Sequence, residues 1–339
     1  MSEPTGAVAG PPETIRYLAA ADVVACMPPL EERLALADRV LRAIVTDAEL
    51  PPKIGVHPRP DSSFGHAMPA YLPGPDASGD ADLVGMKWVV GFPTNSARGL
   101  GTINALVLLN DPVTGFPVAV LDGGPITAQR TAAVSGVAIR AFAPAVAGRP
   151  CRAALIGAGV QGHSHVPVIG HVLPGVELAL HDTDPERAAA LAAEARRTAG
   201  IGAARVAVSA REAVGRADVV VTAAAFGPVR QVMGNDWLAP GALVVAVDYA
   251  TYVAAEVARE AALFLVDESR AFLANRDAGL FDGYPDPPMQ IGEALLAGTS
   301  RPDGRVLVTH LGVGLSDLVF GDAILRTAEA SGRGILLPR

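Results

Sequence analysis

Three glycines in the middle of the chain constrain its fold more than any other feature. The stretch ALIGAGVQGHSH, residues 154–165, ends an apolar run with Gly157, Gly159 and Gly162 in the spacing G-x-G-x-x-G. It follows the strand-like RAALI and is expected to open a helix, which is the setting of a dinucleotide-binding turn. There the glycines let the backbone approach a pyrophosphate at the positive end of the helix dipole. The sequence therefore predicts a parallel α/β sheet around this turn.

An acidic residue at the end of the next apolar run supports this interpretation over a chance glycine match. Asp182 ends VELALHD, 20 residues after Gly162. A carboxylate there accepts hydrogen bonds from the adenosine ribose of NAD. Asp184 adds a second negative charge that would repel the 2′-phosphate of NADP, although Arg187 would offset part of it. We therefore expect NAD, with NADP less favoured.

The remaining organisation follows from the spacing of apolar residues. Residues 31–46 have helical periodicity and are followed by the breaker PPK. Between residues 51 and 122, short runs such as GMKWVVGF and TINALVLLN are separated by turn residues, which predicts an antiparallel sheet. After a helical segment at 128–144, strand-like and helix-like segments alternate, as in a parallel sheet covered on both faces. Gly332 stands where the last helix should be capped.

This order predicts an α/β chain in which a Rossmann domain is inserted into a discontinuous α+β domain. We expect residues 131–309 to form the nucleotide-binding domain. Residues 1–130 plus 310–339 would form a substrate-binding and dimerisation domain. The active site is expected in the crevice beyond the carboxyl ends of the parallel strands.

Composition narrows the possible partners to small molecules. The net charge is −8 and there is no run of Lys or Arg, so neither nucleic acid nor an anionic membrane is an expected partner. No apolar run approaches a membrane span, and MSEPTGAVAGPP lacks the pattern of a signal peptide, so we expect a cytoplasmic protein. Cys26 and Cys151 form neither a disulfide framework nor a ligand pair, and no metal site is predicted.

Six ordered motifs carry a resemblance to a known family. They are HAMPAY, MKWVVGFPTNSARGLGT, DPVTGFPVAVLDGGPITAQRTAAVS, LIGAGVQGHSH, ADVVVTAAA and HLGVGLSD. With these the chain resembles, over almost its whole length, the ornithine cyclodeaminase/μ-crystallin family of NAD(P)-dependent enzymes, which act on α-amino and α-imino acids. The resemblance implies a homodimer formed through the sheet of the terminal segments.

The resemblance assigns roles to several charged residues. Lys87 and Arg130 match positions that hold the substrate carboxylate, for which Arg offers a rigid fork of donors and Lys a point charge. Lys53 matches a further cation, a role for which Arg59 competes. Asp248 matches the catalytic aspartate, which can hold the substrate amine or shuttle its proton. The alternatives are that Lys87 is a solvated strand lysine, that Arg130 forms an ion pair on a helix face and that Asp248 merely ends a strand.

The glycine turn and the family resemblance together predict which residues bind the cofactor. Thr131 matches a residue near the cofactor phosphates and Thr222 falls at a strand end that faces the nucleotide, although either could be a capping or back-bonding threonine. The full predicted set is Thr131, Gly157, Gly159, Val160, Gln161, Gly162, Asp182, Thr222 and Asp248.

Two departures from the family pattern bear on the substrate. His66 stands where cyclodeaminases have Glu, and DYATY replaces the usual Asp-x-Pro-Gly-Lys, so Tyr249 and Tyr252 are expected to alter the pocket. His66 can relay protons, or be an ordinary hydrogen-bonded strand histidine, but it cannot supply a permanent negative charge for the far ammonium of ornithine.

The expected catalytic residues are accordingly Asp248, Lys87 and His66. The favoured reaction is reduction of an α-imino acid to an L-amino acid. The alternative is an ornithine cyclodeaminase that makes L-proline and ammonia with catalytic NAD. A third hypothesis is a non-catalytic binding protein. The joint presence of Lys87, Arg130 and Asp248 argues against it.

Overall fold

The computed structural model of the chain describes residues 13–76, 78–79, 81–225 and 229–339. These residues divide between two compact units. The terminal unit takes its described residues from Met1–Met27, Lys53–Ile126 and Asp317–Arg339, and the central unit consists of Pro28–Pro52 and Thr127–Ser316. The first 12 residues, on which the expectation of no signal peptide rests, lie outside the described residues.

The terminal unit is built on a seven-stranded sheet with the order β15-β1-β6-β5-β4-β3-β2. Its strands are β1 (Thr14–Leu18), β2 (Ile54–Val56), β3 (Phe64–Leu72), β4 (Leu83–Gly91), β5 (Ile103–Asn110), β6 (Pro117–Asp122) and β15 (Ile335–Pro338). The pairs from β2 to β6 are antiparallel, which confirms the sheet predicted from residues 51–122. The short helices are α1 (Ala20–Ala25) and η1 (Pro93–Arg98).

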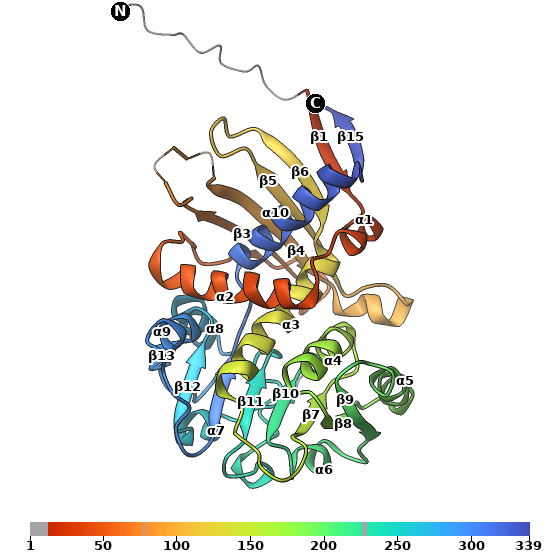
Figure 1. Cartoon of the computed structure of the whole chain (residues 1–339), viewed down its shortest axis with the longest axis vertical. Coiled ribbons are helices and arrows are strands. Elements are labelled where there is room, and N and C mark those ends of the chain that lie inside the picture. Colours follow the sequence, from red (N-terminus) through yellow and green to blue (C-terminus); the bar gives the residue numbers. More distant parts are fainter. Residues whose placement is uncertain (1–12, 77, 80, 226–228) are drawn as a thin grey trace, which may run out of the picture. The chain divides into compact units, whose positions relative to one another are not determined.

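The two faces of this sheet differ. Lys87 and Val89 on β4 are buried, whereas Trp88 between them is exposed, as the two-residue period of a strand requires. Helix α10 (Gly314–Ser331) crosses the strands in Figure 1. Gly321 of α10 faces Val107 on the same side of the sheet as Lys87. Helix α10 therefore covers the inner face, and it ends at Gly332, whose φ of +65° fits the predicted cap.

The central unit contains an eight-stranded sheet with the order β13-β12-β14-β11-β10-β7-β8-β9. Its strands are β7 (Arg152–Ile156), β8 (Val176–His181), β9 (Ile201–Val206), β10 (Val219–Thr222), β11 (Leu243–Ala246), β12 (Leu263–Val266), β13 (Met289–Gln290) and β14 (Val306–Thr309). Every pair is parallel, and β10, β11 and β14 are buried at each position, so both faces of the sheet are covered. Figure 1 shows β7, β10 and β11 side by side. This is the predicted Rossmann arrangement.

The remaining helices are α2 (Leu30–Thr46), α3 (Gly123–Phe142), α4 (Val160–Val172), α5 (Pro185–Ala195), α6 (Ala210–Val214), α7 (Ala255–Glu260), α8 (Ser269–Asp277), α9 (Ile291–Leu296) and η2 (Asn235–Trp237). Helix α3 begins before residue 128, where the sequence places its start. The Asp122 carboxylate accepts a hydrogen bond from the Gly124 N–H at 2.8 Å, and Pro125 is tolerated in a first turn because its missing N–H has no helical partner there.

The bounds of the units differ from the predicted domains at residues 127–130 and 310–316, which belong to the central unit, and at α2. This helix is part of the central unit rather than of residues 1–130. Glu31 of α2 accepts hydrogen bonds from Arg140 and His171, and Leu34 lies against Gly136 of α3. Periodicity detects such a helix, but it does not identify the surface on which the helix packs. Among the described residues, no helix combines the length and apolar character needed to cross a bilayer.

Candidate functional site

The three glycines of the turn have different surroundings, which show which of them the fold requires and which leaves space for a ligand. Gly157 has a φ of +104°, and a Cβ at this position would collide with the backbone of Ala223 at the end of β10. A Cβ on Gly162 would collide with the carbonyl of Gly157. A Cβ on Gly159, by contrast, would meet no described atom within 4 Å. Gly157 and Gly162 thus serve packing, while the backbone at Gly159 is open to a ligand.

Helix α4 begins directly after this opening. Gly159 is its N-cap, and the side chain of Val160 is 71% exposed. The first N–H groups of a helix have no acceptor within it, so they are available to an anion. The structure places the predicted Val160 and Gln161 in this first turn, next to the space at Gly159.

Asp182 follows β8 and lies beside the same turn. One carboxylate oxygen accepts a hydrogen bond from the Ala158 N–H at 2.6 Å and the other accepts one from Asp184 at 2.8 Å. These bonds fix the carboxylate and leave further lone pairs for ribose hydroxyls. Asp184 caps α5 and forms an ion pair with Arg187 at 3.3 Å, so Arg187 offsets Asp184 rather than Asp182.

Asp248 is a buried carboxylate at the carboxyl edge of the parallel sheet. It follows β11, next to Thr222 at the end of β10, and is 1% exposed. Burial raises its pKa to about 6, although the Thr222 hydroxyl and the N–H groups of Tyr252, Ala224 and Thr251 act in the opposite direction. No described group meets either carboxylate oxygen with full hydrogen-bond geometry. The residue therefore exchanges a proton near neutral pH and has acceptor capacity for a ligand.

The DYATY segment after Asp248 has an unusual backbone. Tyr249 and Ala250 adopt φ angles of +51° and +58°, which non-glycine residues rarely do. The Tyr249 hydroxyl donates a hydrogen bond to the Leu311 carbonyl at 2.9 Å. Burial, followed by the negative charges of Asp248 and Asp182, raises the pKa of Tyr252. The two tyrosines thus lie in the surroundings of Asp248, and Tyr249 contacts a loop of the same unit.

Arg130 of α3 lies against that loop. Its side chain is buried, and a Cβ on Gly312 would collide with its guanidinium. Gly312 has a φ of +74°, so both its backbone and its missing side chain suit this contact. Asp267, which follows β12, accepts hydrogen bonds from the N–H groups of Leu311 and Gly312.

Two histidines and a serine form a buried chain behind the turn. The Ser135 hydroxyl lies 2.8 Å from His165 Nε2 and 2.9 Å from His310 Nε2, and His165 Nδ1 lies 2.6 Å from the Gln161 carbonyl. Burial lowers the pKa of His165 to about 4, and burial followed by the charges of His165 and Arg130 lowers that of His310. Both rings are neutral at pH 7, so the chain joins α3, α4 and the residue after β14 without a net charge.

In the terminal unit, Lys87 is buried in an ion pair. Its Nζ lies 2.7 Å from the Asp317 carboxylate of α10, and both side chains are almost inaccessible. A solvated strand lysine is therefore excluded. The pair requires the two charges to remain together, because removing one partner leaves the other buried and uncompensated.

His66 shares the inner face of the sheet with Lys87. Burial, followed by the charges of Lys53, His57 and Lys87, lowers the pKa of His66 to about 4. The imidazole is therefore neutral at pH 7 and can accept a proton or a hydrogen bond. Lys53 is half-buried near this ring, whereas the competing Arg59 is exposed.

Thr131 has a local hydrogen bond. Its hydroxyl donates to the Thr127 carbonyl at 2.7 Å, the back-bonding alternative that its sequence position left open. This bond leaves the oxygen lone pairs available to a further donor.

Sequence reasoning missed several polar residues of these clusters: Ser135, His165, Asp267, His310 and Asp317. Their common signal is a polar side chain within an otherwise apolar segment, as with Asp317 in GLSDLVF. That signal does not show which partner each residue meets.

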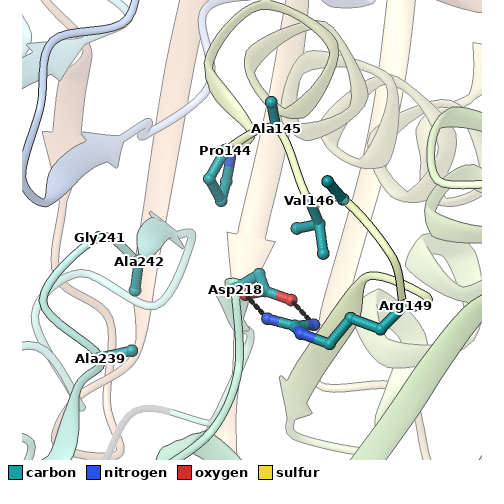
Figure 2. Close-up of a pocket in the computed structure, with 9 residues that line it drawn as sticks. Pro144, Ala145, Val146, Arg149, Asp218, Ala239, Gly241 and Ala242 are labelled. Atoms are coloured by element: carbon teal, nitrogen blue, oxygen red, sulfur yellow. Dashed lines mark hydrogen bonds and ion pairs between the residues drawn. The ribbon is translucent and has the colours of Figure 1, made fainter.

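A cavity of about 300 Å³ lies at the opposite edge of the central sheet, before β7, β10 and β11. Figure 2 shows small side chains around it and the paired carboxylate and guanidinium of Asp218 and Arg149, with N–O distances of 2.7 Å. Because the glycine turn, Asp182 and Asp248 are all at the carboxyl edge, this cavity is not part of the candidate site.

Comparison with known proteins agrees with this fold and these motifs. The family model for the ornithine cyclodeaminase/mu-crystallin family matches residues 18–273. The nodulation efficiency protein NfeD of Rhizobium meliloti is 32% identical over 95% of this chain and 98% of its own. The ketimine reductase mu-crystallin of Mus musculus is 31% identical over 74% of this chain and 76% of its own.

A solved structure extends the likeness of the fold to nearly the whole chain. The Δ(1)-pyrroline-2-carboxylate reductase of Thermococcus litoralis, in complex with NADH and L-proline, has a TM-score of 0.81 with 23% identity. The match covers 95% of this chain and 99% of that one. With the family match over most of the chain, the sequence relatives and this shared fold, the protein belongs to the ornithine cyclodeaminase/mu-crystallin family.

Proposed function

We propose that this protein is an NAD-dependent oxidoreductase that acts at the α-carbon of an amino or imino acid. The favoured reaction is reduction of an α-imino acid to an L-amino acid. One observation carries the proposal: Asp248, a buried carboxylate whose pKa is raised to about 6, stands at the same sheet edge as the open glycine turn. Family membership supports the reaction class, since the relatives include ketimine reductases.

The cofactor is held by the turn and by Asp182. Gly159 gives the pyrophosphate access to the backbone, and the first turn of α4 supplies N–H donors. Asp182 receives the ribose hydroxyls and disfavours a 2′-phosphate by its charge. NADH, when bound, supplies the hydride. A kcat/KM with NADPH equal to or above that with NADH would contradict this cofactor choice.

The chain's own residues bind the substrate and move the proton. Arg130 holds the α-carboxylate with two donors, and Lys87 adds positive charge to substrate binding. Asp248, which is protonated in part of the molecules near pH 6, donates a proton to the imine nitrogen while Cα is reduced. Thr222 lies next to Asp248 and favours its ionised form after the proton has left.

The neutral state of His66 separates this proposal from the cyclodeaminase alternative. Ornithine cyclisation asks for a negative charge near the far ammonium of the substrate, where this chain has an imidazole whose pKa is lowered to about 4. A neutral ring suits an imino acid without a terminal charge. The reductase is therefore favoured.

The test follows NADH absorbance with a panel of cyclic and acyclic α-imino acids and, in parallel, the products formed from L-ornithine. We expect NADH consumption with an imino acid and no proline from ornithine. Steady formation of proline and ammonia with catalytic NAD would establish the cyclodeaminase instead. Binding of NADH without turnover of any substrate would support a non-catalytic binding protein.

A further inference from the structure

The Leu311–Gly312 segment is held by a buried carboxylate. Oδ2 of Asp267 accepts hydrogen bonds from the Leu311 N–H at 2.9 Å and from the Gly312 N–H at 2.7 Å. Oδ1 accepts one from the Glu268 N–H at 3.0 Å. Asp267 is 3% exposed, so this side chain is withdrawn from water while it fixes two successive amides. Charge-assisted bonds of this kind are about twice as strong as neutral ones.

A second side chain holds the same segment by a hydrogen bond to the carbonyl of Leu311. The Tyr249 hydroxyl donates to the Leu311 oxygen at 2.9 Å. Tyr249 directly follows Asp248 and adopts a φ of +51°, a conformation that persists only where the surroundings determine it. Tyr249 belongs to the DYATY segment, in which this chain departs from the family pattern.

The segment so fixed forms a wall for Arg130. Gly312 lies so close to the guanidinium that there is no room for a Cβ between them. A planar guanidinium binds a carboxylate through two parallel donors, so its orientation decides whether both bonds form. A shift of the wall would turn the fork and misplace the substrate.

We propose that Asp267 and Tyr249 are positioning residues that hold Leu311–Gly312 as the rigid wall setting the orientation of the Arg130 guanidinium for a substrate carboxylate. The inference rests on the proposed function, in which Arg130 binds that carboxylate. Neither residue touches the substrate; both act through Gly312.

The experiment compares two substrates that differ only at the carboxylate. NADH oxidation is measured with Δ1-pyrroline-2-carboxylate and with 1-pyrroline for the wild type and for Asp267→Asn and Tyr249→Phe. In Asp267→Asn, kcat/KM for the carboxylate substrate should fall between about tenfold and a hundredfold, mainly through KM, because the fork is misplaced. Tyr249→Phe removes one hydrogen bond and should cost about threefold to tenfold.

The discriminating readout is the kcat/KM for Δ1-pyrroline-2-carboxylate divided by the kcat/KM for 1-pyrroline. It should fall in both variants, because 1-pyrroline has no carboxylate for Arg130 to orient. The dissociation constant of NADH should stay at the wild-type value. A general loss of structure would lower activity on both substrates together and would weaken NADH binding.

Asp218→Asn is the matched control. Asp218 also accepts a backbone N–H, from Arg152 at 2.9 Å, and pairs with Arg149, but it lines the cavity at the opposite edge of the same sheet (Figure 2). This variant should keep the wild-type substrate ratio. If Asp267→Asn and Tyr249→Phe also keep the ratio in an active enzyme, the inference is wrong and the proposed function stands. A wild type that reduces no α-imino acid of the panel would reject the proposed function and, with it, this role.

Discussion

At the scale of single residues, Asp248 should lower stability while it supports turnover. Its pKa is raised from 3.8 to about 6 by burial, so the folded state holds the proton more tightly than the unfolded state does. The stabilisation from this protonated carboxyl is complete below about pH 4 and is lost as the pH rises through 6. Asp248→Asn never ionises, so it should be more stable than wild type at pH 8, by on the order of 3 kcal/mol.

Melting temperatures of both proteins without cofactor, at pH 4 and at pH 8, measure this difference. The variant should gain stability only at the higher pH, lose about a hundredfold or more in turnover, and still bind NADH. Equal melting curves at pH 8 would mean that the carboxylate is solvated in the free protein. Full activity in the variant would remove Asp248 from the chemistry.

Arg130 and Arg140 allow a matched test on one helix. Both belong to α3, but Arg130 is buried whereas Arg140 forms an exposed ion pair with Glu31. Arg130→Ala removes one partner of a desolvated charge pair, which costs roughly 2 to 5 kcal/mol, so kcat/KM should fall at least about thirtyfold. Arg140→Ala should leave steady-state kinetics unchanged. Equal effects of the two substitutions would contradict the assignment of the carboxylate to Arg130.

Lys87→Ala is a less direct test of carboxylate binding. The substitution leaves the Asp317 carboxylate buried without its ammonium partner, which lowers stability in addition to any loss of substrate binding. Its melting temperature must therefore be measured beside its kinetics, and a decrease in both is expected.

At the scale of elements, the turn between β7 and α4 predicts opposite behaviour for two of its glycines. Gly162→Ala places a Cβ against the Gly157 carbonyl and should lower the melting temperature of the free protein. Gly159→Ala points into open space, so the melting temperature should not change, but NADH binding should weaken because the methyl group occupies the approach to the backbone. Thermal unfolding without cofactor and NADH titration separate the two effects. Unchanged NADH affinity in Gly159→Ala would place the pyrophosphate elsewhere.

Elements of this chain differ in how well local sequence predicts them. The parallel sheet, the glycine turn and the antiparallel sheet follow from patterns spanning few residues, and the structure confirms them. The early start of α3 depends on Asp122 capping a glycine-containing turn, which helix propensity alone disfavours. The position of α2 depends on long-range packing on α3, which periodicity does not encode.

The same distinction applies to the candidate site. The spacing after the glycine turn predicted Asp182 as a cofactor ligand, and the family motifs predicted Asp248 as the catalytic aspartate. The raised pKa of Asp248 and the pairing of Lys87 with Asp317 arise from residues far apart in the chain. The partners of Asp267 could not be predicted from the sequence, because they are backbone N–H groups, which have no sequence signature.

At the scale of the whole molecule, the outer face of the seven-stranded sheet carries exposed apolar side chains, which indicate that another protein binds there. Ile54, Ala67, Trp88 and Leu106 are successive cross-strand partners on β2, β3, β4 and β5, so they form one row on the face away from α10. Trp88 is 40% exposed and Leu106 is 45% exposed. A contiguous apolar row of this kind marks an interface between proteins, and an aromatic residue at its centre is typical of one.

We therefore expect a homodimer formed through this face of the terminal unit. Leu106→Lys places a charge beside Trp88 at one end of the row and should convert the dimer to a monomer at micromolar concentration, because a buried unpaired ammonium opposes association. Val208→Lys, at an isolated apolar side chain of the central unit that is 92% exposed, should leave the mass unchanged. Light scattering coupled to size exclusion measures both variants. A wild type of monomeric mass would exclude the dimer, and a Leu106→Lys protein that stays dimeric would place the interface on another surface.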